Sequence, residues 1–285
     1  DIGNWSGGTG NLDTDPLFTD PDTDDFTLQI ASPCIDAGNP DLDGDGTTWA
    51  SDTDDQDPDG TRMDMGAFYY HHQVYNGPIW YISKEGSDLN DGSGSRPFGS
   101  IQKGIDASVN GDTILIGIGQ YVENPVATGK TLTIGSYMLT TSDTSYITQT
   151  IIDGNENGSV LSARGSSIVG LTIQNGKAMT SGGAYQGGGV YLATLINHCI
   201  IQGNFAREGG AMWGVATIKN SIIKNNYALQ GGGMRQPWAT IEDCIFENNS
   251  ASTAGGAIWA GYESGVNYKI TRTIFIGNTS ETGAV

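Results

Sequence analysis

The chain has 285 residues, which is enough for one extended solenoid or for two domains. Its net charge of −19 is uneven, because residues 1–75 hold 17 acidic residues and one basic residue, whereas residues 76–285 hold 15 and 12. Such a chain disfavours nucleic acids and anionic membranes as partners and favours cations. No run approaches the roughly 18 apolar residues of a membrane-spanning helix, so we expect no membrane insertion.

The strongest chemical motif in the acidic part is DLDGDGTTWASD, residues 41–52. Its oxygen-bearing residues stand at the ligand positions of an EF-hand-like loop, with a glycine at the sharp turn. The predicted Ca²⁺ ligands are Asp41, Asp43, Asp45, Thr47 through its carbonyl, and Asp52. An Asp at the last position resembles the loops of dockerin-type modules, although no helical pattern flanks this loop.

A second, partial match to the same spacing follows at Asp55, Asp57 and Asp59, with Gly60 at the turn. Neutralised carboxylates would allow this core-poor segment to order, so the expected role of Ca²⁺ is structural. The alternative is a solvated acidic loop that binds no ion.

Residues 71–78 (HHQVYNGP) are the expected linker, and residues 79–135 open a solenoid. A first strand precedes a polar Gly-rich loop, and a short helix is expected near 99–109 because Ile101, Ile105 and Val109 have helical spacing. The segment GDTILIGIGQYVEN provides the first full strand and corner. Later strands are expected near 131–134, 150–152, 168–173 and 189–192.

A Gly-Gly-[Gly/Ala] signal recurs at Gly187, Gly209, Gly231 and Gly255, in steps of 22, 22 and 24 residues. The β-branched strings CIIQGN, SIIKNN, CIFENN and TIFIGN lie between these glycines. A period of this length indicates stacked units that cannot bury their apolar faces alone. The pattern predicts an all-β fold, a right-handed parallel β-helix with one coil per repeat.

The strings align on four asparagines, for which we expect inward side chains that bond neighbouring coils and one another: Asn204, Asn226, Asn249 and Asn278. Alternation along each strand predicts four further inward pairs, Cys199 with Ile201, Ser221 with Ile223, Cys244 with Phe246, and Thr273 with Phe275. The two cysteines lie two coils apart, roughly 10 Å, which exceeds the reach of a disulfide.

Three outward columns carry polar residues. The first two are expected to form weak surface salt-bridge ladders: Asn197, Lys219, Glu242 and Thr271, and Gln202, Lys224, Glu247 and Ile276. The third holds His198, Asn220, Asp243 and Arg272, whose members are spread over too many coils to favour acid–base catalysis. We therefore expect no catalytic residues in this chain.

A fourth column follows the glycine signals and is expected to face outward, with Tyr191, Trp213, Arg235 and Trp259. Aromatic rings interleaved with a guanidinium can stack on sugar rings or on a partner protein. The alternative is that loops such as 261–268 cover this stripe.

The order of IWYISKEGSDLNDGSGSRPFGSIQKGIDASVNGDTILIGIGQYVEN, IIDGN, IVGLTIQNG and GGGVY resembles bacterial secreted right-handed parallel β-helix repeat proteins of the pectate-lyase-like superfamily, over residues 79–285. Residues 1–70 (GNLDTDPLFTDPDTDDFTLQIASPCIDAGNP to DPDGTRMDMGAFYY) resemble the C-terminal closing module of the same family. That resemblance implies a cap module at 1–70, a linker at 71–78 and a parallel β-helix at 79–285.

The resemblance indicates a fold and not one activity, because such repeats serve enzymes, adhesins and passive surface proteins alike. The function that we expect is an extracellular structural or adhesive protein of a bacterial cell surface. Its expected partners are cell-surface polysaccharide or other copies of itself, because an acidic cap and an uncapped last coil would fit head to tail as a filament. The alternative, which explains the cap-like start and the uncapped last coil equally well, is that the chain is one stretch of a longer polypeptide. The alternatives are a carbohydrate-active enzyme of the polysaccharide lyase type, with its groove in coils outside this chain, and a non-catalytic carbohydrate-binding module.

Overall fold

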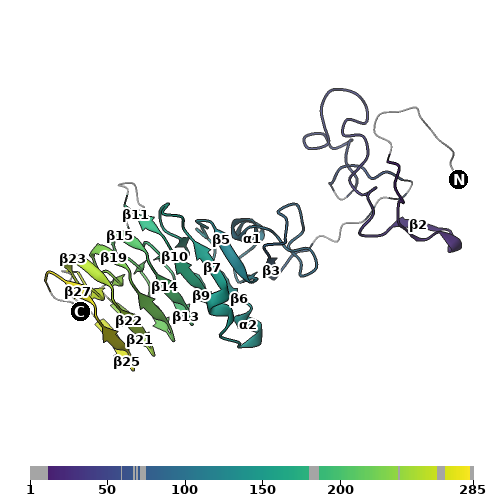
Figure 1. The fold of residues 1–285 in the computed structure, drawn as a ribbon. Helices are drawn as coiled ribbons and strands as arrows, with labels where there is room; N and C mark the ends of the chain where they lie inside the picture. Colours follow the sequence, from purple (N-terminus) through teal and green to yellow (C-terminus); the bar gives the residue numbers. More distant parts are fainter. Residues whose placement is uncertain are drawn as a thin grey trace. The chain divides into compact units, whose positions relative to one another are not determined.

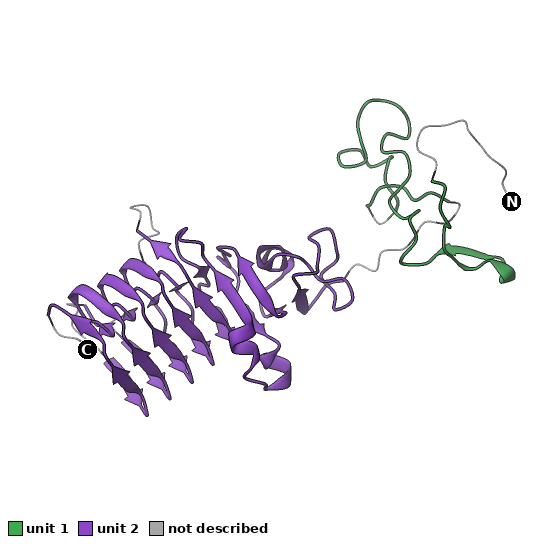
Figure 2. Ribbon diagram, in the orientation of Figure 1, with its two compact units in different colours: residues 1–74 green, residues 75–285 purple. Residues whose placement is uncertain are grey.

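The structure is a computed structural model that describes residues 12–58, 60–66, 68, 70, 75–179, 186–236, 238–261 and 267–282. The chain divides into two compact units, residues 1–74 and residues 75–285 (Figure 2). None of the helices in the described ranges has the length and apolar character needed to cross a bilayer.

The first unit is loop-rich, as its composition predicts. Strand β1 (Phe18–Asp20) pairs antiparallel with β2 (Asp25–Leu28) across the 3-10 turn η1 (Pro21–Thr23). Apolar burial is sparse, with Leu28 and Cys34 as the buried hydrophobic side chains among the described residues of this unit. Its loops are held by backbone hydrogen bonds, such as that from Gly38 to Met63, and by bonds from backbone N–H groups to carboxylates, such as that from Asp36 to Asp64.

The second unit is a parallel β-solenoid, which confirms the predicted fold class (Figure 1). Its first strands are β3 (Ile79–Ile82), β4 (Thr113–Ile116), β5 (Gly119–Val122), β6 (Thr133–Ser136), β7 (Thr150–Asp153), β8 (Leu161–Ser162), β9 (Ser167–Val169), β10 (Thr172–Gln174) and β11 (Lys177–Ala178). The strands of the repeats are β12 (Val190–Tyr191), β13 (Leu195–Asn197), β14 (Ile200–Gln202), β15 (Phe205–Glu208), β16 (Met212–Trp213), β17 (Thr217–Lys219), β18 (Ile222–Lys224), β19 (Tyr227–Gln230), β20 (Met234–Arg235), β21 (Trp238–Glu242), β22 (Ile245–Glu247), β23 (Ser250–Ala254), β24 (Ile258–Trp259), β25 (Asn267–Thr271), β26 (Ile274–Ile276) and β27 (Thr279–Ser280).

Four parallel sheets run along the solenoid. The eight-stranded sheet has the order β3-β4-β6-β9-β13-β17-β21-β25 and the seven-stranded sheet the order β5-β7-β10-β14-β18-β22-β26. The short-strand sheet is β8-β12-β16-β20-β24, and the second five-stranded sheet is β11-β15-β19-β23-β27. The expectation of one strand over 168–173 is wrong, because a corner with Gly170 at φ +71° separates β9 from β10.

The core lies between the sheets, and the predicted inward residues fill it. Cys199, Ser221 and Cys244 are each 1% exposed, and Ile201, Ile223 and Phe246 are fully buried. In the coil of β26, Thr273 and Phe275 are half-buried. The ring of Phe246 stacks on that of Phe275 at 5.2 Å, so the apolar column continues into this coil.

The predicted asparagine ladder is present. The Asn226 side chain donates to Asn249 Oδ1 at 2.9 Å, and its own Oδ1 accepts from the backbone N–H and the side chain of Asn204, both at 3.0 Å. The next rung repeats the pattern, since Asn249 donates to Asn278 Oδ1 at 2.9 Å. Asn226 and Asn249 also donate to the carbonyls of Ile201 and Ile223. Each buried amide therefore joins neighbouring coils through hydrogen bonds that no water competes for.

The Gly-Gly signals occur where coils approach backbone to backbone. Gly209 has φ +68°, and a Cβ there would lie 2.1 Å from the carbonyl oxygen of Met212. A Cβ on the next residue, Gly210, would lie 2.3 Å from the carbonyl oxygen of Gly232 in the following coil. A side chain at either position is excluded, which explains why this pair recurs in every repeat.

The helix α1 (Ile101–Ala107) begins after the N-cap Ser100 and packs on β3 and β4. Ile101 and Ile105 enter the core, so the helix covers the apolar end of the first coil. The expectation for Val109 is wrong, because the helix ends at Ala107 and Val109 is 64% exposed. Two further short helices, α2 (Met138–Thr141) and α3 (Tyr146–Gln149), lie between β6 and β7.

We expect Gly209→Ala to destabilise the solenoid by roughly 2–5 kcal/mol, because it adds both a strained left-handed residue and a backbone clash. Gly203→Ala is the matched control, since Gly203 has φ +64° but the nearest atom to an added Cβ lies 3.6 Å away. Its expected cost is about 1–2 kcal/mol. Urea unfolding measures both, and equal losses would contradict the close approach at Gly209.

Candidate functional site

The predicted stripe lies in register along the short-strand sheet. Tyr191 pairs with Trp213, Trp213 with Arg235, and Arg235 with Trp259 on successive coils. The preceding residue of each pair faces the core, with Val190, Met212 and Met234 fully buried and Ile258 6% exposed. The four stripe residues lie on the opposite, outward side of each strand and are half-buried.

Stacking within the stripe accounts for this partial burial. The Tyr191 and Trp213 rings are stacked, with centroids 5.5 Å apart and planes at 23°. The Arg235 guanidinium lies 4.9 Å from the centroid of the Trp259 ring. The covering loop proposed for the stripe falls mainly at residues 262–266, outside the described residues. The faces of these rings therefore point partly along the solenoid axis and toward one another.

A hollow of about 400 Å³ adjoins the stripe where the short-strand sheet turns into the eight-stranded sheet. Its walls come from four successive coils and consist of Arg164, Leu192, Ala193, Thr194, Trp213, Gly214, Ala216, Arg235, Gln236 and Trp238. Trp238 is 54% exposed and is the most accessible tryptophan of the solenoid's described part. Ala193, Gly214 and Ala216 on the two middle coils have small side chains. They leave space between Arg164 on the first coil and Trp238 on the fourth.

One local difference between coils shapes this hollow. Four residue steps separate Trp213 from Thr217, which pairs with Thr240, but five separate Arg235 from Thr240. The coil of Trp238 therefore has one residue more between these two sheets than the coil before it. The Tyr268 hydroxyl donates to the carbonyl of Gln236, which anchors this wall from the next coil. Burial raises the pKa of Tyr268 to about 12, so the hydroxyl keeps its proton for this bond.

Two arginines give the hollow its charge. Arg235 is fixed, because its Nε lies 3.4 Å from Glu208 Oε2 while its guanidinium rests on Trp259. Arg164 is exposed and has no ion pair within the described ranges. The uncompensated positive charge at this corner is therefore on Arg164. Sequence periodicity missed Arg164, Gln236 and Trp238, although the additional residue in the coil of Trp238 is a visible signal.

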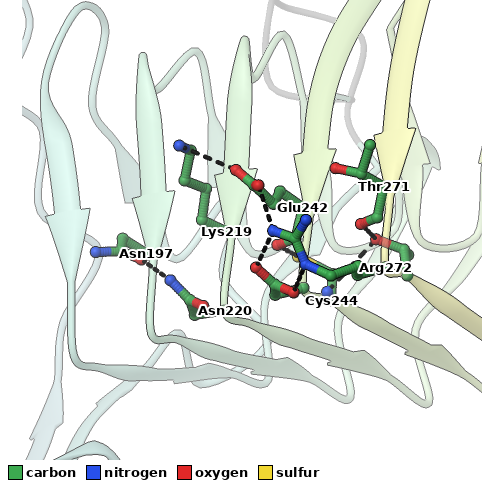
Figure 3. A network of polar contacts seen from close by, with 9 residues as sticks. Asn197, Lys219, Asn220, Glu242, Cys244, Thr271 and Arg272 are labelled. Carbon is green, nitrogen blue, oxygen red and sulfur yellow. Dashed lines mark hydrogen bonds and ion pairs between the residues drawn. The ribbon is translucent and has the colours of Figure 1, made fainter.

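The two predicted salt-bridge ladders differ. Lys219 and Glu242 pair across adjacent coils at 3.2 Å, as predicted (Figure 3). No ion pair joins Lys224 and Glu247, both of which are described residues, so the second ladder is absent. Arg272 binds Asp243 at 2.6 and 2.8 Å and also donates to Glu242. These bonds hold the pKa of Asp243 and of Glu242 below their ordinary values.

The column of His198, Asn220, Asp243 and Arg272 has a conformational explanation. All four residues have positive φ, between +47° and +54°, at the corner between the eight-stranded and seven-stranded sheets. The first three donate their backbone N–H groups to the coil that follows. Asn, Asp and His adopt this left-handed conformation more readily than most residues, so the first three members mark a corner, and Arg272 occupies the same corner with its guanidinium bound to Asp243.

A buried polar cluster that the sequence reasoning missed surrounds Asp153, which is 5% exposed. Its Oδ2 accepts hydrogen bonds from the side chains of Gln120 at 2.8 Å, Gln174 at 3.0 Å and Asn175 at 2.7 Å. Burial raises the pKa of this carboxyl, but the hydrogen bonds led by Gln174 outweigh it and leave the pKa lowered. The ionised carboxylate thus ties three coils of the seven-stranded sheet together.

The predicted metal ligands are only partly brought together. Carboxylate oxygens of Asp41, Asp43 and Asp55 lie within 4.8 Å of one another, whereas the described cluster does not include Asp45, Asp52 or Asp57. A hydrogen bond with Asp54 raises the pKa of Asp52 to about 6. Asp45 Oδ1 accepts from the backbone N–H of Thr47 at 2.7 Å. Asp59 lies outside the described residues.

The cysteines are free and buried. Burial raises the pKa of Cys199 to about 11 and also raises that of Cys244. Their thiols are therefore protonated packing groups, and the prediction that these two do not pair is confirmed.

The strand register defines this unit as a parallel β-solenoid. The chain matches no family model and no curated protein sequence. Among solved structures it is similar to the pectin methyl esterase of rice weevil, with TM-score 0.44 and 15% identity over 64% of this chain and 63% of that chain. It is also similar to the pectin methylesterase from Aspergillus niger in penultimately deglycosylated form, with TM-score 0.43 and 15% identity over 72% and 69%. The chain spans just under two thirds of the weevil enzyme, and likeness at these values carries no argument about a site or an activity.

We expect Asp153→Asn to lower the free energy of unfolding at pH 7 by roughly 1–3 kcal/mol. The new side-chain NH2 group would face the NH2 groups of Gln120, Gln174 and Asn175, none of which can accept a hydrogen bond from it. Since the folded-state pKa is depressed, the stabilisation is present above the ordinary pKa of 3.8 and is lost as the pH falls through the folded value. The gap between wild type and variant should therefore shrink below pH 3.8.

Urea unfolding at pH 7 and pH 3 measures this gap. Asp243→Asn is the control, because that carboxylate is also hydrogen-bonded but lies at the surface, and it should change stability little. An Asp153→Asn protein as stable as wild type at pH 7 would contradict a structural role for the cluster.

Proposed function

We propose that this chain is an extracellular, non-catalytic carbohydrate-binding solenoid whose ligand is an acidic polysaccharide. The observation that carries the proposal is the hollow beside the stripe, where Arg235 and the exposed Trp238 on one coil and Arg164 three coils away line the same concave surface. Aromatic rings bind the apolar faces of sugars, and guanidinium groups bind carboxylates in fixed geometry.

The repeat geometry supports a polymeric ligand. The walls come from coils spaced about 4.8 Å apart, so a glycan along the axis meets a new set of side chains at each coil. Trp238 is the expected stacking platform, because the Tyr191 and Trp213 rings already stack on each other. The stripe residues Trp213 and Arg235 then act as the rigid wall, and Trp259 holds the guanidinium in place.

A surface that binds polysaccharide can serve adhesion, so an adhesive role follows from this proposal. Head-to-tail association of copies of the chain stays a prediction. The alternative of a polysaccharide lyase needs acidic and basic side chains that are free to react with a sugar. Two solenoid carboxylates described above are instead hydrogen-bonded to other side chains. Asp153 accepts from three amides and Asp243 from Arg272. Both carboxylates therefore have structural partners.

Trp238→Ala should weaken the binding of oligogalacturonate, used as an acidic glycan probe, by about tenfold or more, because it removes the exposed stacking surface. Titration calorimetry on the full chain measures the affinity. Tyr227→Ala is the matched control, since Tyr227 is 38% exposed but lies on the second five-stranded sheet, and it should stay within about twofold of wild type.

Arg164→Ala should weaken the binding of the acidic probe but leave the binding of a neutral cello-oligosaccharide unchanged, because only the acidic probe interacts with the positive charge of Arg164. Failure of both glycans to bind, or equal losses in Trp238→Ala and Tyr227→Ala, would overturn the proposal. New unsaturated or reducing ends in the probe would instead establish an enzyme.

A further inference from the structure

Residues 41–55 bring together carboxylates that the sequence assigns to two separate motifs. One carboxylate oxygen from each of Asp41, Asp43 and Asp55 lies within 4.8 Å of the other two. That limit is twice a Ca²⁺–oxygen distance of about 2.4 Å, so three oxygens at such separations can ligate one ion of this size.

Asp55 provides evidence independent of the acidic clustering. Its side chain is fully buried, and its Oδ1 accepts a 2.5 Å hydrogen bond from the backbone N–H of Leu42, which lies between the other two acids in the sequence. Its Oδ2 is enclosed and has no hydrogen-bond partner within the described part of the chain. Burial of a carboxylate oxygen without a donor or a cation is costly, so this oxygen requires a metal ion or a proton.

Among the described residues of the first unit, no Lys or Arg side chain is available for this role. Arg62 is the one Lys or Arg in residues 1–74, and its guanidinium donates to the carbonyls of Ala37 and Gly38. The other two carboxylates are oriented by the loop itself. Asp41 accepts from the backbone N–H groups of Gly44 at 2.8 Å and Gly46 at 3.1 Å. Three carboxylates are thus held close together, and no Lys or Arg of the described residues pairs with them.

We infer that Asp41, Asp43 and Asp55 together hold one hard divalent cation, for which Ca²⁺ fits the all-oxygen ligand set best. The site differs from the EF-hand-like expectation, because its third acid comes from the second motif and Asp45 and Asp52 are not ligands. The ion joins the turn at Gly44 to the segment that follows Asp52. It therefore stabilises a unit that has few apolar contacts of its own.

The test is calorimetric titration of the full, chelator-stripped chain with Ca²⁺ alone, and separately with Mg²⁺ alone. We expect one Ca²⁺ site, with affinity lowered at least about tenfold by Asp43→Asn and by Asp55→Asn, because each removes one ligand charge. Asp45→Asn is the matched control in the same loop and should stay within about threefold of wild type. Mg²⁺ should bind more weakly, because its shorter bonds of about 2.1 Å demand tighter geometry.

Asp43 is exposed, so we expect Asp43→Asn to fold normally. It therefore tests the site even if Asp55→Asn disturbs folding. In the chelator-treated state, Asp55→Asn should melt at or above the wild-type temperature, since it removes a buried uncompensated charge. Absence of Ca²⁺ binding to the wild type, wild-type affinity in Asp55→Asn, or a tenfold loss in Asp45→Asn would each overturn this site. Mg²⁺ binding as tight as Ca²⁺ would overturn the assignment of the ion.

Discussion

The hydrogen bond between equivalent residues of successive coils is the interaction on which this structure depends. A single coil cannot enclose a core, so each strand obtains its partners from the coils before and after it. The strict register, such as Ile201 opposite Ile223 and Ile223 opposite Phe246, stacks apolar side chains into continuous columns. The asparagine ladder adds side-chain bonds to the same stack, inside the core where water does not compete.

This stacking also creates the surface features. Because residues at the same place in each coil form a column, one type of side chain repeated at that place becomes a stripe. Trp213 stacks on Tyr191 and Arg235 on Trp259 for that reason. The hollow exists where the repetition is broken, by Gly214 on one coil and by one additional residue between Arg235 and Thr240 on the next. A regular scaffold thus presents its candidate binding site at an irregular point.

The repeat was predictable from the sequence, because the Gly-Gly pairs and the inward asparagines obey geometric requirements that allow few substitutes. A positive φ and a 2.1 Å approach leave glycine alone at Gly209. The hollow was not predictable from alignment of the repeats, since Arg164 and Trp238 matter through their departure from the pattern. Nor was the division of 168–173 into β9 and β10, because a continuous apolar run does not reveal a corner at Gly170. In the first unit, spacing grouped Asp41 with Asp52, whereas the fold places Asp55 beside Asp41.

Replacement of one rung of the asparagine ladder tests the central claim most directly. Asn226→Ala removes an amide that donates to Ile201 and Asn249 in the neighbouring coils and accepts twice from Asn204. Its neighbour Asn225 is exposed with φ +55°, so Asn225→Gly is the matched control. In urea unfolding, Asn226→Ala should lose about 2–5 kcal/mol while Asn225→Gly stays near wild type. Wild-type stability in Asn226→Ala would contradict the account that these buried bonds between coils hold the solenoid together.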